Sequence, residues 1–245
     1  QHDRTPMLQY YEGNVYTNME YYESDDAVVT VPWALYKAYG NVRMLEKHYP
    51  CIKKWIEFIS SRVRDGLWPV DYQYGDWLAL DARANSCIGI TDVSLIASAA
   101  YARAADLAAR IADVLDRDYD ARNFRALHKK IKRAYQREFI TATGRLAVNT
   151  QTAHILTLRF DLCEEEHRDR IANDLFRLIE ENNDCLTTGS AGTPSVLSLL
   201  TSLGRHDLAA RVLFRDDMPS WLYAVRHGAT TIWERWNSYI AETGT

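Results

Sequence analysis

The segment W-E-R-W at residues 233–236 places a single carboxylate between two indole rings. A carboxylate beside such low-dielectric surface is suited to acid–base chemistry, which makes Glu234 a candidate catalytic residue. The same residues also fit a structural arrangement, in which Glu234 and Arg235 form surface pairs while Trp233 and Trp236 fill the core. The pattern alone leaves both interpretations open.

A second carboxylate stands beside an aromatic ring in the loop Y-G-D-W-L-A-L-D at residues 74–81. Asp76 and Trp77 suit a pyranose, because the ring can stack on the sugar's C–H face while the acid bonds its hydroxyls. The alternative is an Asp that caps the following turn and a Trp in the core. Asp25 and Asp26 stand directly before Ala27, at the start of a predicted helix. Capping is the default role for such residues, although only one of the two can be the N-cap.

Several other patterns of catalysis or cofactor binding do not occur in the sequence. The stretch T-T-G-S-A-G-T-P at 187–194 lacks G-x-x-x-x-G-K, so we reject a P-loop and predict that Thr193 caps a helix starting at Pro194. There is no G-x-S-x-G or H-E-x-x-H motif, and the four cysteines form no C-x-x-C pair. We therefore expect reduced cysteines and no nucleotide, metal or redox cofactor.

Helices must position these loops, because apolar residues recur every three to four positions through most of the chain. The predicted helices cover 25–39, 42–63, 91–115, 118–139, 150–160, 166–181, 193–203 and 205–214. Pro32 predicts a kink or a helix start, and Pro50 is expected in the first turn of its helix. Residues 66–90 lose the period and form a long connection, which in compact domains is often functional. Paired antiparallel helices in one all-α domain over residues 1–245 are the resulting prediction.

The composition narrows the class of protein. The 245 residues are 47% apolar, with 29 basic and 33 acidic side chains and a net charge of −4. The high apolar content excludes a disordered chain. The small negative net charge provides no electrostatic attraction for nucleic acid, so no nucleic-acid partner is expected. The sequence contains no run of eighteen consecutive apolar residues, the length needed to span a membrane, so no membrane partner is expected either. Gln1 to Arg4 lead into no apolar signal-peptide region, which slightly favours a cytoplasmic location.

The loops and their flanks resemble the catalytic domain of bacterial α-L-rhamnosidases, family 78 of the glycoside hydrolases. The matching stretches run in the family's order along almost the whole chain. They are D-A-V-V-T-V-P-W-A-L-Y (26–36), Y-G-D-W-L-A-L-D (74–81), L-T-T-G-S-A-G-T-P (186–194), P-S-W-L-Y (219–223) and G-A-T-T-I-W-E-R-W-N-S (228–238). The last of these is highly specific, and it favours the functional interpretations of Glu234 and Trp77.

The resemblance implies an (α/α)6 toroid of antiparallel helix pairs that hydrolyses terminal non-reducing α-L-rhamnosides with inversion. Its catalytic residue would be Glu234, as the general base. The implied substrate-binding residues are Asp26, Asp76, Trp77, Trp221, Trp233 and Trp236. The implied partner is a small-molecule or oligosaccharide rhamnoside.

Two departures from the family shape further expectations. The family's acid lies in a D-E-R-x-G-W-type motif that this sequence lacks, and Ser24 stands where the family usually has Trp. We therefore expect an incomplete toroid from a longer parent chain with further domains, carrying the base side of the site and inactive alone. The alternatives are a non-catalytic carbohydrate-binding or scaffold domain, and a different (α/α)6 glycosidase that acts on glucosides.

Overall fold

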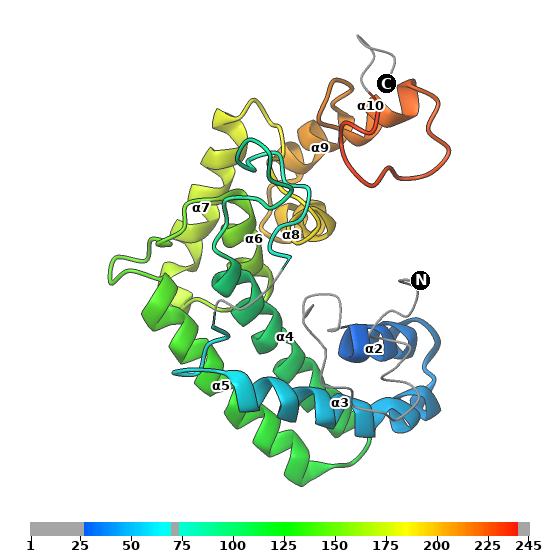
Figure 1. Ribbon diagram of the computed structural model, residues 1–245, viewed down its shortest axis with the longest axis vertical. Helices are drawn as coiled ribbons and strands as arrows, with labels where there is room; N and C mark the ends of the chain where they lie inside the picture. The colour runs from blue at the N-terminus through cyan, green and yellow to red at the C-terminus, as the bar shows by residue number, and fades with distance from the viewer. Residues whose placement is uncertain (1–26, 70–73, 240–245) are drawn as a thin grey trace. The chain divides into compact units, whose positions relative to one another are not determined.

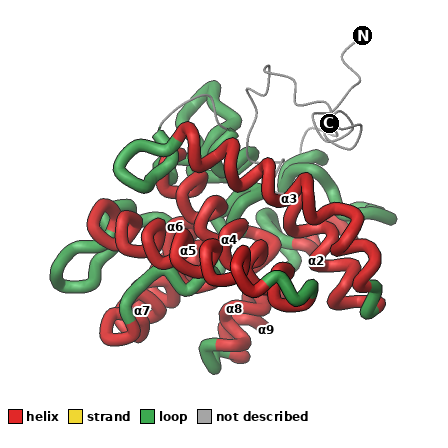
Figure 2. Tube along the Cα trace, turned by 90° about the horizontal axis from the view of Figure 1, so that it is seen from below, coloured by secondary structure: helices red, strands yellow, loops and turns green. Residues whose placement is uncertain are grey.

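The computed structural model describes residues 27–69 and 74–239, and its regular structure is helical (Figure 1). The α-helices are α2 (Ala27–Tyr39), α3 (Val42–Arg62), α4 (Val93–Val114), α5 (Asp118–Phe139), α6 (Gln151–Arg159), α7 (Glu165–Glu181), α8 (Val196–Ser202), α9 (His206–Phe214) and α10 (Trp221–Arg226). A 3₁₀ helix, η2 (Thr193–Ser195), precedes α8. In the described residues, β-structure is limited to isolated bridges, so the predicted all-α class is confirmed (Figure 2).

The described residues fall into two compact units. The first comprises those of Gln1–Tyr74 and Val93–Glu138, and the second those of Gly75–Asp92 and Phe139–Thr245. A single domain over residues 1–245 therefore stays a prediction. All eight predicted helices are present within a few residues of their expected bounds, and α10 is an additional helix that the periodicity did not reveal.

In the first unit, helices α2, α3 and α4 pack against one another. The alanine-rich face of α4 allows close approach, and the fully buried Trp55 of α3 provides a large apolar side chain in this core. Helix α5 is tied to α3 by Asp120, which accepts hydrogen bonds from Tyr49 (2.7 Å) and Lys53 (3.0 Å). Burial, followed by the hydrogen bond to Asp120, raises the pKa of Tyr49, and the hydrogen bond from Tyr49 lowers the pKa of Asp120.

Pro50 lies deeper inside its helix than the sequence predicted, and Pro32 also lies inside a helix. Helix α3 starts at Val42 and continues through Pro50, which corrects its predicted place in the first turn. Pro50 is exposed, while the opposite face buries Leu45, Ile52 and other apolar side chains, so packing outweighs one lost backbone hydrogen bond. Helix α2 begins before Pro32, which excludes a helix start at this proline and leaves the predicted kink as the other alternative.

In the second unit, α6 packs against α7 and α8, α8 against α9, and α9 against α10. Helix α6 is buried on almost every side although half of its residues are polar. Its Thr150 caps the helix by accepting a hydrogen bond from the Ala153 N–H, and its Thr157 bonds to the Ala153 carbonyl. The remaining polar side chains of α6 are available for contacts with other segments.

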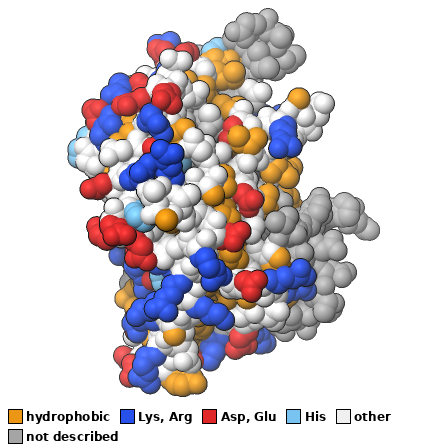
Figure 3. Space-filling model, turned by 90° about the vertical axis from the view of Figure 1, so that its left-hand side faces the viewer, with side chains coloured by type: hydrophobic (Ala, Val, Ile, Leu, Met, Phe, Trp, Pro, Cys, Tyr) orange, Lys and Arg blue, Asp and Glu red, His pale blue; other side chains and the backbone are white. Residues whose placement is uncertain are grey.

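On the surface, acidic and basic side chains are interspersed on the face shown in Figure 3, in keeping with the small net charge. Within the residues that the structure describes, no helix combines the length and apolarity that crossing a membrane requires.

The buried His154 of α6 predicts a specific dependence of stability on pH. Burial lowers the pKa of His154 below its ordinary value of 6.5, and its Nδ1 atom lies 2.7 Å from the Thr150 carbonyl oxygen. Below pH 6.5 the unfolded chain therefore binds a proton that the folded chain does not. The free energy of unfolding should fall by up to about 1.4 kcal/mol per pH unit until the lowered folded pKa is reached.

Urea unfolding of His154→Gln and of the wild type between pH 7.5 and 5 measures this contribution. The variant should show a weaker decline of the midpoint with falling pH. The exposed His206, changed to Gln, is the matched control and should retain the wild-type decline. Parallel curves for His154→Gln and the wild type would contradict the assignment.

Candidate active site

A cavity of about 440 Å³ lies in the second unit, where three loops and α10 meet. Its lining comes from the three loops that the sequence singled out. The lining residues are Trp77, Leu78, Gly189, Ser190, Thr193, Pro194, Ser220, Trp221, Ala224, Val225 and the continuous segment 229–236. A cavity of this size, with aromatic walls and a few polar groups, is typical of small-molecule sites.

Glu234 lines this cavity and is exposed. Within the described part of the chain, its carboxylate has no hydrogen bond or ion pair, and the neighbouring Arg235 does not pair with it. The surface-pair interpretation from the sequence is therefore not what the structure shows. Because a carboxylate can accept several hydrogen bonds, Glu234 has its full acceptor capacity available to a molecule in the cavity.

Four half-buried tryptophans form the aromatic part of the lining: Trp77, Trp221, Trp233 and Trp236. Trp221 and Trp236 pack edge to face, with ring centroids 5.1 Å apart. The Trp236 indole N–H also donates to the Thr188 carbonyl at 3.4 Å, which links the W-E-R-W segment to the 187–194 loop. Aromatic faces partly open to a cavity are suited to stacking against a sugar ring.

Helix α10 orders the last of the three loops. Ser220 caps this helix by accepting the Tyr223 N–H, and it directs Trp221 into the cavity lining. Trp233 rests edge to face on Tyr223, with centroids 6.3 Å apart, and the Tyr223 hydroxyl donates to the Tyr239 carbonyl. These contacts fold residues 228–239 back over α10.

Asp76 is positioned differently from its sequence neighbour Trp77. Its side chain is fully buried and does not line the cavity. The carboxylate accepts hydrogen bonds from the Thr152 hydroxyl and from the backbone N–H groups of Gly189 (2.9 Å) and Ala191 (2.8 Å). All of these contacts are internal. This geometry does not favour the predicted contact between Asp76 and sugar hydroxyls.

The backbones of the 74–81 and 187–194 loops run in direct contact. The Ser190 N–H donates to the Trp77 carbonyl, and the Leu80 N–H donates to the Thr187 carbonyl, each at 2.9 Å. A Cβ atom on Gly189 would lie 2.2 Å from the Trp77 carbonyl oxygen, so only glycine fits here. Leu78, on the cavity wall, has φ +60°, a left-handed conformation that large side chains such as leucine rarely adopt.

Helix α6 supports the start of the 187–194 loop through the Gln151 side chain. The Gln151 side chain accepts the Thr187 N–H and donates to the Cys185 carbonyl, each at 3.0 Å. It thereby joins the start of α6 to the turn that enters the loop. This role of Gln151 could not be predicted from the sequence, because Gln151 stands 34 and 36 positions from its partners.

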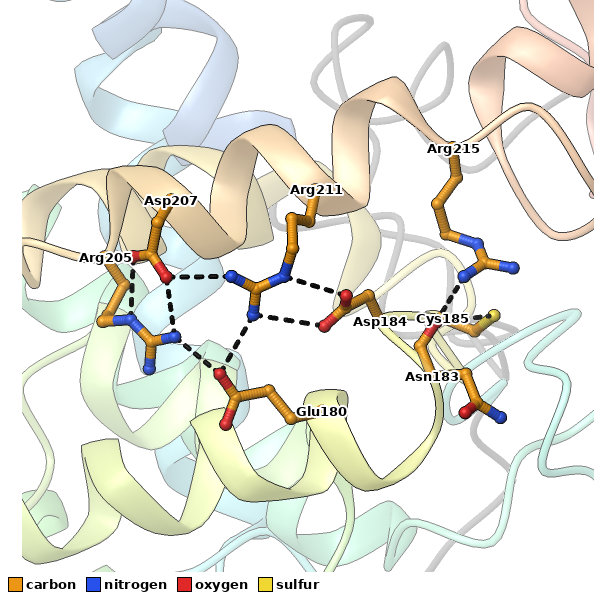
Figure 4. Close-up of polar contacts among 8 residues, drawn as sticks. All are labelled: Glu180, Asn183, Asp184, Cys185, Arg205, Asp207, Arg211 and Arg215. Atoms are coloured by element: carbon orange, nitrogen blue, oxygen red, sulfur yellow. Dashed lines mark hydrogen bonds and ion pairs between the residues drawn. The ribbon is translucent and has the colours of Figure 1, made fainter.

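An ion-pair network fixes the same turn from its solvent side (Figure 4). Arg211 of α9 bonds Asp184 at 2.9 Å and Glu180 of α7 at 3.0 Å, while Arg205 joins Glu180 to Asp207. The Arg205 hydrogen bond lowers the pKa of Asp207 far below its ordinary value. Helix α9 is thereby held against the end of α7 and against the turn that leads to the 187–194 loop.

The residue that caps the helix after the 187–194 loop differs from the one predicted. Thr193 does not cap the following helix. The N-cap of η2 is Gly192, and the Thr193 hydroxyl instead lies 2.7 Å from that of Thr188, because the loop folds back on itself. Asp26 lies outside the described residues. Of the predicted site residues, the structure brings Glu234 and the four tryptophans together in one cavity and places Asp76 behind its wall.

A helical scaffold that exposes a carboxylate in a cavity with four tryptophans in its lining is suited to binding and acting on a small polar molecule such as a sugar. The chain matches, over residues 8–245, the family described as the bacterial α-L-rhamnosidase six-hairpin glycosidase domain. It therefore belongs to this family.

Individual relatives agree with the family match. The chain is 38% identical over 219 residues to an α-L-rhamnosidase of Streptomyces avermitilis, covering 89% of the chain and 20% of that protein. It is 35% identical to an α-L-rhamnosidase of Formosa agariphila, covering 89% and 24%. The chain thus spans about a fifth to a quarter of the length of these relatives.

Solved structures show the same fold. The Streptomyces avermitilis α-L-rhamnosidase complexed with L-rhamnose aligns with a TM-score of 0.83 at 38% identity, covering 89% of this chain and 20% of that one. The native α-L-rhamnosidase from Aspergillus terreus aligns with a TM-score of 0.88 at 34% identity, covering 95% and 28%. The fold is therefore that of the six-hairpin glycosidases.

Proposed function

We propose that residues 1–245 form part of an (α/α)6 catalytic domain that hydrolyses terminal non-reducing α-L-rhamnosides with inversion. One observation carries this proposal: Glu234, whose carboxylate has no partner among the described residues, lines a cavity whose walls include four tryptophans. The names of the relatives indicate that the sugar is L-rhamnose, and the cavity presents the Glu234 carboxylate as a group that can act as a base.

In this mechanism Glu234 acts as the general base. It takes a proton from a water molecule, whose oxygen attacks the anomeric carbon on the face opposite the leaving group. A separate carboxylic acid protonates the departing oxygen, roughly 6.5–9.5 Å from the base so that the water fits between them. We assign this general acid to no residue of this chain.

The tryptophans have a positioning role in the proposal. Trp77, Trp221, Trp233 and Trp236 would stack on or enclose the sugar ring and exclude bulk water. Excluding water strengthens the electrostatic interactions of Glu234 with the developing oxocarbenium-like charge. Holding sugar and water in contact with the base also removes much of the entropic cost of bringing them together.

The test measures turnover and binding together. The complete protein is assayed against a panel of aryl glycosides, and L-rhamnose binding is measured by calorimetry on the same material. We expect hydrolysis of the α-L-rhamnoside in preference to the glucosides, together with saturable rhamnose binding. Rhamnose binding without turnover would support a carbohydrate-binding domain instead. Preferential hydrolysis of a glucoside would support a different glycosidase.

A further inference from the structure

Asp76 is a buried carboxylate that the proposed mechanism does not use, although it lies directly behind the cavity wall. We propose that Asp76 is a positioning residue that fastens the two cleft loops to each other and to α6, and so sets the places of Trp77 and Ser190. The loop arrangement stands on its own contacts, while its consequence for sugar binding rests on the proposed function.

The first support is the way in which three donors converge on one carboxylate. Oδ2 accepts from the Thr152 hydroxyl and the Gly189 N–H, and Oδ1 accepts from the Ala191 N–H. The donors belong to α6 and to the 187–194 loop, whereas Asp76 belongs to the 74–81 loop. A single side chain therefore joins three segments, and its donors stand 76 to 115 positions from Asp76 in sequence.

The second support is the rigidity of the anchor. Thr152 is 1% exposed and lies in the buried first turn of α6, so it provides a fixed reference point for the carboxylate. Gly189 and Ala191, by contrast, have their N–H groups in an irregular loop, where no helix or sheet holds them. Without Asp76, the buried Gly189 N–H and the half-buried Ala191 N–H would lose the acceptor that they have in this structure.

The third support is the direct connection from Asp76 to the cavity. Trp77 follows Asp76 in the chain, and Ser190 lies between the two residues whose N–H groups Asp76 accepts. Both Trp77 and Ser190 line the cavity, and the Ser190 N–H donates to the Trp77 carbonyl. A change at Asp76 would therefore reach the cavity as a displacement of these two wall residues, without any contact between Asp76 and the sugar.

The experiment uses four variants that separate this role from general stability. Asp76→Asn keeps the shape but replaces one acceptor oxygen with a donor NH₂ that faces N–H or O–H groups. Thr152→Val removes the hydroxyl that donates to Asp76, whereas Thr152→Ser retains a hydroxyl at this position. Thr157→Val is the matched control, because Thr157 is equally buried in α6 but its hydroxyl bonds within the helix to the Ala153 carbonyl.

The first readout is amide hydrogen exchange in peptides that cover residues 187–194, and it does not depend on any sugar. We expect at least tenfold faster exchange in Asp76→Asn and a smaller acceleration in Thr152→Val. Thr152→Ser and Thr157→Val should exchange at the wild-type rate in this segment. Unchanged exchange in Asp76→Asn, or equal effects of Thr152→Val and Thr157→Val, would overturn the proposal. If Asp76→Asn does not fold, the three threonine variants decide the question.

The second readout is the affinity for L-rhamnose, measured by calorimetry. We expect at least tenfold weaker binding in Asp76→Asn, with affinity restored in Thr152→Ser relative to Thr152→Val. Wild-type rhamnose affinity in a variant whose 187–194 loop exchanges faster would refute the link to the cavity. If the wild type itself binds no rhamnose, the proposed function fails, and the exchange measurement still decides the role of Asp76 in the loops.

Discussion

Replacing Glu234 with Gln should lower the hydrolysis of an aryl α-L-rhamnoside by the complete protein at least a hundredfold. The amide keeps the size of the side chain but cannot take the proton from the attacking water, and general base catalysis contributes about 10²–10⁴-fold. Folding should be unaffected, because Glu234 is exposed and makes no hydrogen bond within the described residues. Steady-state kinetics should show the loss in kcat rather than in KM.

The matched control is Glu138→Gln, which makes the same chemical change at an exposed position of α5. It should hydrolyse the rhamnoside at the wild-type rate. Near-normal turnover of Glu234→Gln would remove Glu234 from the mechanism and leave the cavity without its proposed base.

Adding one methyl group at Gly189 should have an effect of similar size by a purely steric route. The new Cβ would lie 2.2 Å from the Trp77 carbonyl oxygen and 2.7 Å from the Ala79 nitrogen, so the two loops must move apart by roughly 1 Å. Displacements of this size in an active site can reduce the rate by about 10²-fold. We expect that loss in rhamnoside hydrolysis by Gly189→Ala, with weaker L-rhamnose binding.

Gly204→Ala separates this effect from general destabilisation. Gly204 has φ +78° with open space around it, so alanine there costs about 1–2 kcal/mol of strain without a clash. Gly204→Ala should lower the urea midpoint while the protein keeps wild-type hydrolysis. Wild-type hydrolysis by Gly189→Ala would show that the contact between the two loops does not shape the cavity.

The helices could be predicted from the sequence because apolar periodicity is a local property. Most boundaries agree within two or three residues, and α10 was missed because its six residues are too few to establish a period. The preference of proline for the first turn of a helix is also a local rule, and it predicts a first-turn position for Pro50 that α3 does not show. Packing of the apolar face of α3 overrides that rule at an exposed position.

The candidate site was predictable in part, for a related reason. Short segments rich in tryptophan marked the cavity wall, and the structure brings Trp77, Trp221, Trp233 and Trp236 to one place with Glu234. What could not be predicted was which carboxylate faces the cavity, because that depends on burial and on contacts distant in sequence.

Asp76 and Glu234 look alike in sequence, since each is an acid next to Trp. The structure separates them by solvent exposure and by hydrogen bonding. Asp76 is 0% exposed and its oxygens accept three internal hydrogen bonds, whereas Glu234 is exposed on the cavity surface. A buried carboxylate that is fully hydrogen-bonded stabilises its surroundings, and an exposed one without a partner can react.

The most direct test of the proposed inverting mechanism is the anomeric configuration of the sugar first released from an aryl α-L-rhamnoside by the complete protein. Proton NMR at early times, before mutarotation, distinguishes the two anomers. Because a water activated by Glu234 attacks the face opposite the leaving group, β-L-rhamnose should appear first. Initial release of α-L-rhamnose, or no release of rhamnose at all, would contradict it.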